Sequence, residues 1–311
     1  MLEEIIIRNY KIFKGTHKIS LSTDPAAPVT VIVGKGASGK TTISDAVRWC
    51  LYGSRMLRPG YDKCLMNHER FREMADGDEE EVSVELLFPD SSYCRKIVYK
   101  KQSDELFTSR EEFTHKGNVV ELPQAPLNEL LFWDETIVFD RSLKRLAKQL
   151  RQAIESKIKF LTPSKQEVII STVMCRIANR ADDYFQEMYF RNGNFRVRWD
   201  NGFFLEGDDM GLSSTDQLVF NVSVLLASYD ALIRGKYVLP LVIDNIFTYA
   251  SPNQFPVKKL LSQFSRLQAL LLFHDYTFDL HDVSKEKVGI TYRMQLNDNN
   301  HTSASLSSCG H

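Results

Sequence analysis

The stretch from Val29 to Tyr52 constrains the fold of this chain more than any other. Five consecutive β-branched residues, Val29–Val33, are typical of a buried strand. Residues Gly34–Thr41 follow and fit the pattern G-x-x-x-x-G-K-[ST]. Apolar residues then recur at helical spacing over Ile43–Leu51. The pattern therefore lies in the strand, loop and helix context that a phosphate-binding loop requires.

The chemistry of phosphate binding explains these residue types. Gly34, Gly36 and Gly39 let the backbone turn tightly and point its N–H groups at phosphate oxygens, at the positive end of a helix dipole. Lys40 is placed to reach the β- and γ-phosphates, and the Thr41 hydroxyl to hold Mg²⁺. The alternative is a glycine-rich turn with a surface lysine. Because every specified position and both flanks match, we favour the phosphate loop.

Composition adds few further limits. The chain has 311 residues, 43% hydrophobic and 25% charged, which suits one large or two modest domains. With 39 basic and 40 acidic residues the net charge is −1, so only a local basic patch could favour nucleic acid. Five cysteines without a C-x-x-C pair indicate reduced thiols. The N-terminus lacks a secretory pattern, and no apolar run approaches about 18 residues, so we expect a cytoplasmic protein with no membrane segment.

The N-terminal half reads as strands around the phosphate loop. Leu2–Tyr10 is predicted as a first strand with Lys18–Leu21 as its neighbour, and residues 53–70 as a loop. An antiparallel β lobe beside the nucleotide is expected from three further strands, Val82–Phe88, Tyr93–Tyr99 and Glu105–Phe107, with a turn at Pro89–Ser92.

Two carboxylates follow an apolar stretch in Leu130–Val138. Asp134 and Glu135 are expected where this segment leaves a strand. One interpretation is a solvated turn, and the other is that they position a metal ion or water near the γ-phosphate. Spacing alone does not separate the two.

The middle of the chain, from Arg141 to Arg198, is predicted to be mostly helical. A leucine and isoleucine stripe begins at Leu143, and Pro163 separates it from a second amphipathic run, Val168–Phe190. We expect a helical hairpin whose basic faces are solvated surface, with nucleic-acid contact as the alternative.

The C-terminal part alternates strands and helices. A hairpin is expected over Phe195–Leu205, and a long buried helix with Ser213 or Ser214 as its N-cap. Two buried strands are predicted to end in polar residues, Asp244 and His274, with a helix over Leu260–Leu267 between them. An acid at a strand end downstream of a phosphate loop is typical of a Mg²⁺ site. A strand histidine is usually structural, but this order of elements favours a functional one. A last strand follows Val288, and then a disordered tail.

With these elements placed, the chain resembles the ATPase head of the ABC type found in SMC, RecF and related DNA-maintenance proteins. It resembles most closely the DndD family of DNA sulfur modification ATPases. The matching motifs, which cover nearly the whole chain, are IIIRNYKIFKG, GKGASGKTTISDAVRWCLYG, LLFWDETI, GLSSTDQ in the place of the ABC signature, LPLVIDN in the place of the Walker B strand, and LLLFHD as the switch-histidine strand.

The resemblance implies an α/β fold, a P-loop NTPase head with a mixed sheet, an antiparallel β lobe and a short helical hairpin. It implies ATP and Mg²⁺ as cofactors, and an ATP-dependent homodimer in which Ser213 of one subunit closes over ATP bound by the other. The implied nucleotide contacts are Gly34, Gly36, Ser38, Gly39, Lys40, Thr41, Thr42 and Ser213. The implied metal ligands are Thr41, Asp244 and Asp134, and the implied catalytic residues are Asp244, Asn245, His274 and Glu135.

Some residues depart from the family pattern. The signature glycines are replaced by Ser214 and Thr215, whose side chains would obstruct close approach to phosphate. Asn245 stands where many ABC ATPases carry a glutamate, and an amide cannot accept a proton from water at neutral pH. We therefore expect slow turnover, with Glu135 as a candidate for the missing carboxylate.

The resemblance divides the chain into four parts. These are an N-terminal half-head (1–140), a hairpin segment in place of a coiled coil (141–210), a C-terminal half-head (211–296) and a disordered tail (297–311). Only about seventy residues separate Asp140 from Gly211, too few for an extended arm, so the chain is either a naturally short head or an excised part of a longer protein.

Three functions remain open from the sequence. The first is an ATPase head that works with DNA-processing partner proteins, in DNA modification or anti-phage defence. The second is a nucleotide-regulated assembly module without hydrolysis. The third is an ATP-dependent DNA clamp, with DNA contacted by the basic hairpin.

Overall fold

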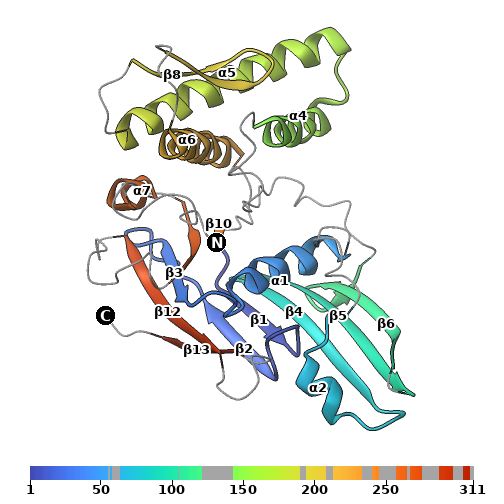
Figure 1. Cartoon of the computed structure of the whole chain (residues 1–311). Helices are drawn as coiled ribbons and strands as arrows, with labels where there is room; N and C mark the ends of the chain where they lie inside the picture. The colour runs from blue at the N-terminus through green and yellow to red at the C-terminus, as the bar shows by residue number, and fades with distance from the viewer. Residues whose placement is uncertain are drawn as a thin grey trace.

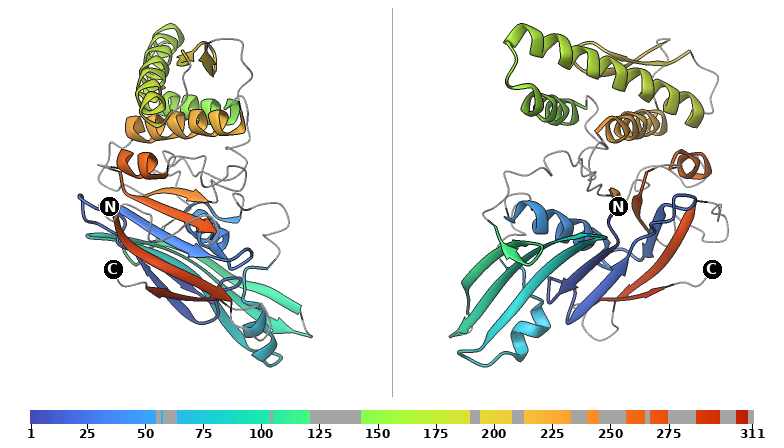
Figure 2. Two further views of the ribbon diagram at one scale, coloured as in Figure 1. Left: turned by 60° about the vertical axis from the view of Figure 1, so that its left-hand side comes forward. Right: turned by 180° about the vertical axis from the view of Figure 1, so that it is seen from behind.

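The computed structural model describes residues 1–54, 57, 64–103, 105–120, 143–189, 194–207, 213–232, 240–244, 257–264, 267–274, 287–296 and 304–308. They form two large sheets and, at one end of the molecule, a helical layer that includes a two-stranded sheet (Figure 1). In both views of Figure 2 the helical layer lies at one end of the molecule and the two large sheets lie at the other. No helix of this described part is long and apolar enough to cross a membrane.

The phosphate loop leaves a five-stranded sheet of order β10-β11-β3-β12-β13. Four strands are parallel, and only the edge strand β13 is antiparallel to its neighbour. The strands are β3 (Val29–Gly34), β10 (Leu241–Asp244), β11 (Ala269–His274), β12 (Val288–Leu296) and β13 (Ala304–Ser308).

Strand β3 is covered on both faces, which explains its uninterrupted β-branched sequence. Val29, Val31 and Val33 belong to the core beneath the helical layer. Ile32, on the opposite face, belongs to the core around the phosphate-loop helix. The predicted buried strand is therefore present, at the centre of its sheet.

A second, antiparallel sheet has the order β2-β1-β4-β5-β6-β7. Its strands are β1 (Glu4–Arg8), β2 (Thr16–Ser20), β4 (Glu79–Phe88), β5 (Ser91–Gln102), β6 (Glu105–His115) and β7 (Asn118–Val119). The expected β lobe is thus present and is joined by the first hairpin of the chain. Strand β6 is longer than the predicted Glu105–Phe107, because its polar residues are held by pairing with β5 rather than by an apolar pattern.

Helix α1 (Lys40–Tyr52) lies between the two sheets and packs against β4 and β5 on one side and β3, β10 and β11 on the other. Arg95 of β5 is 1% exposed, and its Nε donates to the Cys50 carbonyl oxygen at 3.1 Å. Its Nη1 donates to Glu111 at 2.9 Å. A buried guanidinium at the negative end of α1 satisfies a carbonyl that the helix leaves unpaired.

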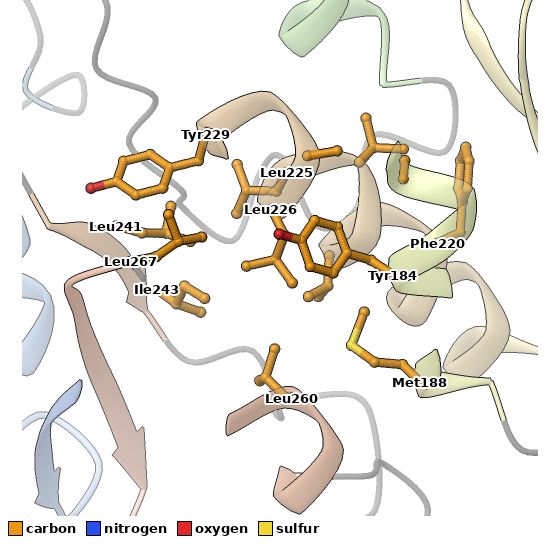
Figure 3. Close-up of a cluster of buried hydrophobic side chains, with 14 of the residues drawn as sticks. Tyr184, Met188, Phe220, Leu225, Leu226, Tyr229, Leu241, Ile243, Leu260 and Leu267 are labelled. Carbon is orange, nitrogen blue, oxygen red and sulfur yellow. The ribbon is translucent and has the colours of Figure 1, made fainter. Parts of the chain in front are cut away.

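The helical layer covers the other face of the five-stranded sheet. It contains α4 (Lys144–Ile158), α5 (Pro163–Met188), α6 (Ser214–Leu232), α7 (Val257–Gln263) and a hairpin of β8 (Arg196–Trp199) and β9 (Phe203–Glu206). Helix α5 packs on α6, and Figure 3 shows Tyr184, Leu225 and Leu260 among the side chains of their shared core with α7 and β10.

The helical hairpin forms as predicted from the leucine stripe. Leu143, Leu146 and Leu150 are fully buried, and α5 begins with Thr162 as N-cap and Pro163 in its first turn. The residues of α4 and α5 share one core with β3 and β11, so this middle segment packs against the sheet that carries the phosphate loop.

Three predictions are wrong in their detail. Residues 53–70 were expected as a loop, but α2 (His68–Glu73) begins there, with Asn67 accepting hydrogen bonds from the Glu69 and Arg70 amides. The tail was expected to be disordered, but Ala304–Ser308 pairs with β12 as β13. The strand forms because its backbone hydrogen-bonds to β12, although its polar sequence does not predict a strand. The helix predicted over Leu260–Leu267 is α7, which ends at Gln263.

Candidate functional site

The phosphate loop joins β3 to α1 through a left-handed glycine. Gly39 caps α1 with φ 98°, a conformation that costs glycine little and other residues more. At Gly34, a methyl group would lie 2.6 Å from Ser38 Oγ and 2.7 Å from the Met294 carbonyl oxygen. Lys35, Gly36 and Ala37 are exposed at the loop's outer edge. The fold therefore requires the pattern glycines and leaves the loop open to a ligand.

Lys40 folds back over the loop that precedes it. Its Nζ donates to the carbonyl oxygens of Gly34 and Lys35, both at 2.7 Å, and to Ser38 Oγ at 3.3 Å. The side chain is 5% exposed. These neutral acceptors hold the ammonium at the loop, where phosphate oxygens would be stronger, charged acceptors.

His274 lies at the carboxyl end of β11, the strand beside β3, and Asp244 lies at the carboxyl end of β10, the next strand out. His274 pairs in register with Gly34, and Asp244 pairs with Leu272. Because side chains alternate along a strand, both share a face with Val242, Leu270 and Leu272, which belong to the core around α1. The sheet thus directs Asp244 and His274 to the side occupied by the phosphate-loop helix.

The histidine approaches the loop closely. A methyl group at Gly36 would lie 3.9 Å from His274 Cε1, the one heavy atom within 4 Å among the described residues other than its chain neighbours. Asp244 is 1% exposed, in contrast to the partly exposed His274. The structure therefore brings Gly34, Gly36 and His274 together, with Asp244 one strand further along.

The oxygen atoms that this site offers as ligands fit Mg²⁺ better than a metal ion that protein side chains coordinate alone. Thr41 offers a hydroxyl in the first turn of α1, and Asp244 a carboxylate at the end of β10. Among the described residues, no group of three or more His, Cys, Asp or Glu side chains could hold a metal ion. Mg²⁺ commonly takes one or two protein oxygens and completes its shell with water and phosphate.

Ser213 begins α6, on the other face of the sheet from α1. Its backbone N–H and hydroxyl both donate to Asp216 Oδ2, at 2.9 and 2.7 Å, and the Asp216 amide donates back to Ser213 Oγ at 3.2 Å. This reciprocal cap is the predicted N-cap. Of the residues replacing the signature glycines, Ser214 is exposed and Thr215 is buried, so only Ser214 adds bulk at the surface.

Ser38 and Thr42 complete the loop as the sequence places them, with Ser38 1% exposed and Thr42 partly exposed in α1. Three predicted site residues, Asp134, Glu135 and Asn245, lie outside the described residues.

Two features of the site were not predicted from the sequence motifs. Ile12 and Met294 both approach Gly39 from distant parts of the chain. A buried charge pair also lies beside the loop, with Lys11 Nζ 3.6 Å from Asp45 Oδ2. Burial, and then the charge of Asp45, raises the pKa of the neighbouring Tyr10 phenol, which stays neutral. The one available sequence signal was an acidic residue, Asp45, within the predicted helix over Ile43–Leu51.

A parallel sheet with a phosphate loop at its centre, an antiparallel sheet behind the loop helix and a helical layer above define a P-loop NTPase head of the ABC type. The sequence comparison agrees at the level of family: residues 4–205 match the family model described as AAA domain, and the chain belongs to that family. No curated protein sequence matches the chain significantly.

Solved structures show the same fold at low identity. An SMC head bound to the C-terminal winged-helix domain of ScpA is similar with a TM-score of 0.66 and 13% identity, over 99% of this chain and 97% of that one. A Pyrococcus furiosus Smc head with an extended coiled coil, bound to the ScpA C-terminal domain, gives 0.64 and 13%, over 99% and 96%. The Thermotoga maritima SMC head domain gives 0.54 and 15%, over 100% and 99%. The fold is therefore that of an SMC head.

Proposed function

We propose that this chain is a head that binds ATP, hydrolyses it slowly and dimerises on nucleotide. The observation that carries the proposal is the convergence of the phosphate loop, Asp244 and His274 at adjacent strand ends, on the face of the sheet that α1 covers. A loop glycine faces the histidine, and a lysine lies at the loop. This combination suits a nucleoside triphosphate better than a smaller anion.

Each residue has a distinct role in this proposal. Backbone N–H groups of Gly36, Ser38 and Gly39, with Lys40, bind the phosphates, and Thr42 lies beside them. Thr41 and Asp244 would hold Mg²⁺, which neutralises phosphate charge, and Asp134 is proposed as a further ligand. His274 contacts the terminal phosphate.

The composite-site proposal rests on the position of Ser213. Because α6 and α1 lie on opposite faces of one sheet, no described contact joins Ser213 to the phosphate loop of its own chain. A second copy, placed head to tail, would supply the missing serine. ATP then stabilises the dimer by contacting both subunits, and hydrolysis releases it.

Two residues account for the proposed slow turnover. Asn245 cannot act as a base, and exposed Ser214 hinders close approach of the partner. We propose Glu135 as the substitute carboxylate.

The partners are proposed by analogy. Two similar SMC heads are bound to ScpA domains, and we propose that this chain also works with protein partners that process DNA. DndD-like DNA modification or anti-phage defence in the cytoplasm is the proposed setting, with residues 141–210 in place of a coiled coil.

Steady-state phosphate release tests whether the head is an enzyme. We expect slow Mg·ATP-dependent release by the wild type and background release by Lys40→Ala, because the lysine positions and neutralises the transferred phosphoryl group. Release that does not depend on Lys40 would favour the rival proposal, a nucleotide-regulated assembly module without hydrolysis.

The DNA-clamp alternative rests on the basic surface of α4 and the turn after it, where Lys144, Lys148 and Lys159 are exposed. A clamp would bind DNA with an affinity that falls with salt and rises with ATP. DNA binding with an affinity that depends on neither salt nor ATP would exclude the clamp.

A further inference from the structure

The loop between β1 and β2, residues 9–15, is held in a strained shape; we call it the bracket loop. Asn9 and Lys11 both have φ of 50°, in the left-handed region. Asparagine tolerates this conformation, but for lysine it costs about 1 kcal/mol. Such strain persists only where surrounding contacts fix it, and it gathers at functional sites.

Two other parts of the chain, β4 and residues 65–67, hold the bracket loop. The Asn9 side chain donates to Glu80 Oε1 at 2.9 Å and accepts from the Gly15 amide at 2.9 Å. The Lys11 amide donates to the Leu65 carbonyl at 2.7 Å, and Asn67 Nδ2 donates to the Lys11 carbonyl at 2.6 Å. The loop is therefore held by hydrogen bonds within itself and to β4 and residues 65–67.

A last bond comes from the C-terminal edge strand. The Ala304 amide, at the start of β13, donates to the Ile12 carbonyl oxygen at 3.0 Å. Ala304 is 1% exposed and belongs to the same core as α1. Strand β13 thus bonds to the bracket-loop residue whose side chain approaches Gly39 of the phosphate loop.

Ile12 packs against the phosphate loop at Gly39, whose backbone is in the left-handed conformation. A methyl group at Gly39 would lie 2.6 Å from Ile12 Cγ2 and 2.9 Å from Met294 Cε. Met294 pairs in register with Gly34 on one side and with Leu306 on the other. Ile12 and Met294 therefore fill the space beside Gly39, at the point where the loop enters α1.

We infer that Ile12 is a positioning residue for nucleotide binding: braced by β13, it holds Gly39 in its left-handed conformation and so keeps the amides of Gly39 and Lys40 aimed at the phosphates. The inference rests on the proposed function. A preorganised cradle binds more tightly because no ordering cost is incurred on binding. Without Ile12, space opens behind Gly39 and the loop samples other shapes.

Simple core packing is the competing explanation, and a matched variant separates the two. Ile19 lies on β2, one hairpin arm away, in the same core, and is fully buried, whereas Ile12 is only partly buried. If both act only as core residues, Ile19→Ala should be the more damaging to stability and neither should affect affinity selectively.

The test compares Ile12→Ala, Ile12→Val and Ile19→Ala by calorimetric titration with Mg·ATP and by thermal melting. We expect Ile12→Ala to weaken binding about tenfold and Ile12→Val less, with a smaller fall in Tm than Ile19→Ala, whose affinity stays within about twofold of wild type. An Ile12→Ala protein with wild-type affinity, or equal losses of affinity for both alanine variants, would overturn the inference.

The bond from β13 has its own pair of variants. Ala304→Pro removes the N–H that donates to the Ile12 carbonyl oxygen, and Ala304→Gly keeps that N–H. We expect weaker Mg·ATP binding for the proline variant, by about threefold, than for the glycine variant. Equal affinities would remove β13 from the bracing role.

Amide hydrogen exchange without nucleotide keeps this inference distinct from the proposed function. Faster exchange over residues 34–41 in Ile12→Ala, with unchanged exchange in Ile19→Ala, supports the brace even if the wild type fails to bind ATP. Unchanged exchange in Ile12→Ala would overturn it. Failure of wild-type binding alone would count against the proposed function.

Discussion

Lys40→Ala is expected to lower the affinity for Mg·ATP by at least about a hundredfold, the largest effect among the site variants. The ammonium already lies over the phosphate loop, bonded to the Gly34 and Lys35 carbonyls. Phosphate oxygens would replace these neutral acceptors, and alanine offers no charge to them. Calorimetric titration measures the loss directly, and alanine, a strong helix former, preserves the start of α1.

Lys35→Ala is the matched control for Lys40→Ala. It removes a lysine five residues earlier in the same loop, whose side chain is exposed where that of Lys40 is buried. We expect its affinity to stay within a few-fold of wild type, because an exposed charge interacts weakly through water. Equal losses in the two variants would indicate that only general positive charge matters.

Gly34→Ala is expected to destabilise the fold by about 2–4 kcal/mol. The added methyl would lie 2.7 Å from the Met294 carbonyl oxygen, which the β3–β12 pairing keeps in place, and 2.6 Å from Ser38 Oγ. Either the sheet or the phosphate loop must shift. Urea denaturation of the purified variant measures the change in the free energy of unfolding.

Gly36→Ala provides a control within the same loop. There the methyl meets His274 Cε1 at an ordinary contact distance of 3.9 Å, and no closer atom of the described part of the chain beyond its neighbours in sequence. We expect a change of less than about 1 kcal/mol in unfolding free energy. Equal stability of the two alanine variants would contradict the close packing of β3 against β12 on which the loop geometry depends.

The elements that carry the site were readable because each has a local signal. The β-branched run of β3 reports burial on both faces, and the loop pattern reports a glycine-dependent turn. Strand alternation also predicts a shared face for Asp244 and His274 once β10 and β11 are recognised as strands. Ser213 was readable as an N-cap because its partner Asp216 follows three residues later.

The missed features arise from contacts between distant segments. Strand β13 has the sequence ASLSS, with little apolar pattern, and forms because β12 offers backbone partners. Helix α2 is short and polar, so only its Asn67 cap marks it. Ile12 and Met294 are ordinary apolar residues in sequence. Their role appears only when the bracket loop and β12 meet at Gly39.

Light scattering with and without Mg·ATP tests the central claim, that the phosphate loop is half of a site completed by Ser213 of a second copy. We expect the wild type to become dimeric only with Mg·ATP. Ser213→Arg, which places a bulky side chain at the start of α6, should bind ATP normally and remain monomeric. A wild-type protein that binds Mg·ATP and stays monomeric, or a Ser213→Arg protein that dimerises as readily as wild type, would contradict the account.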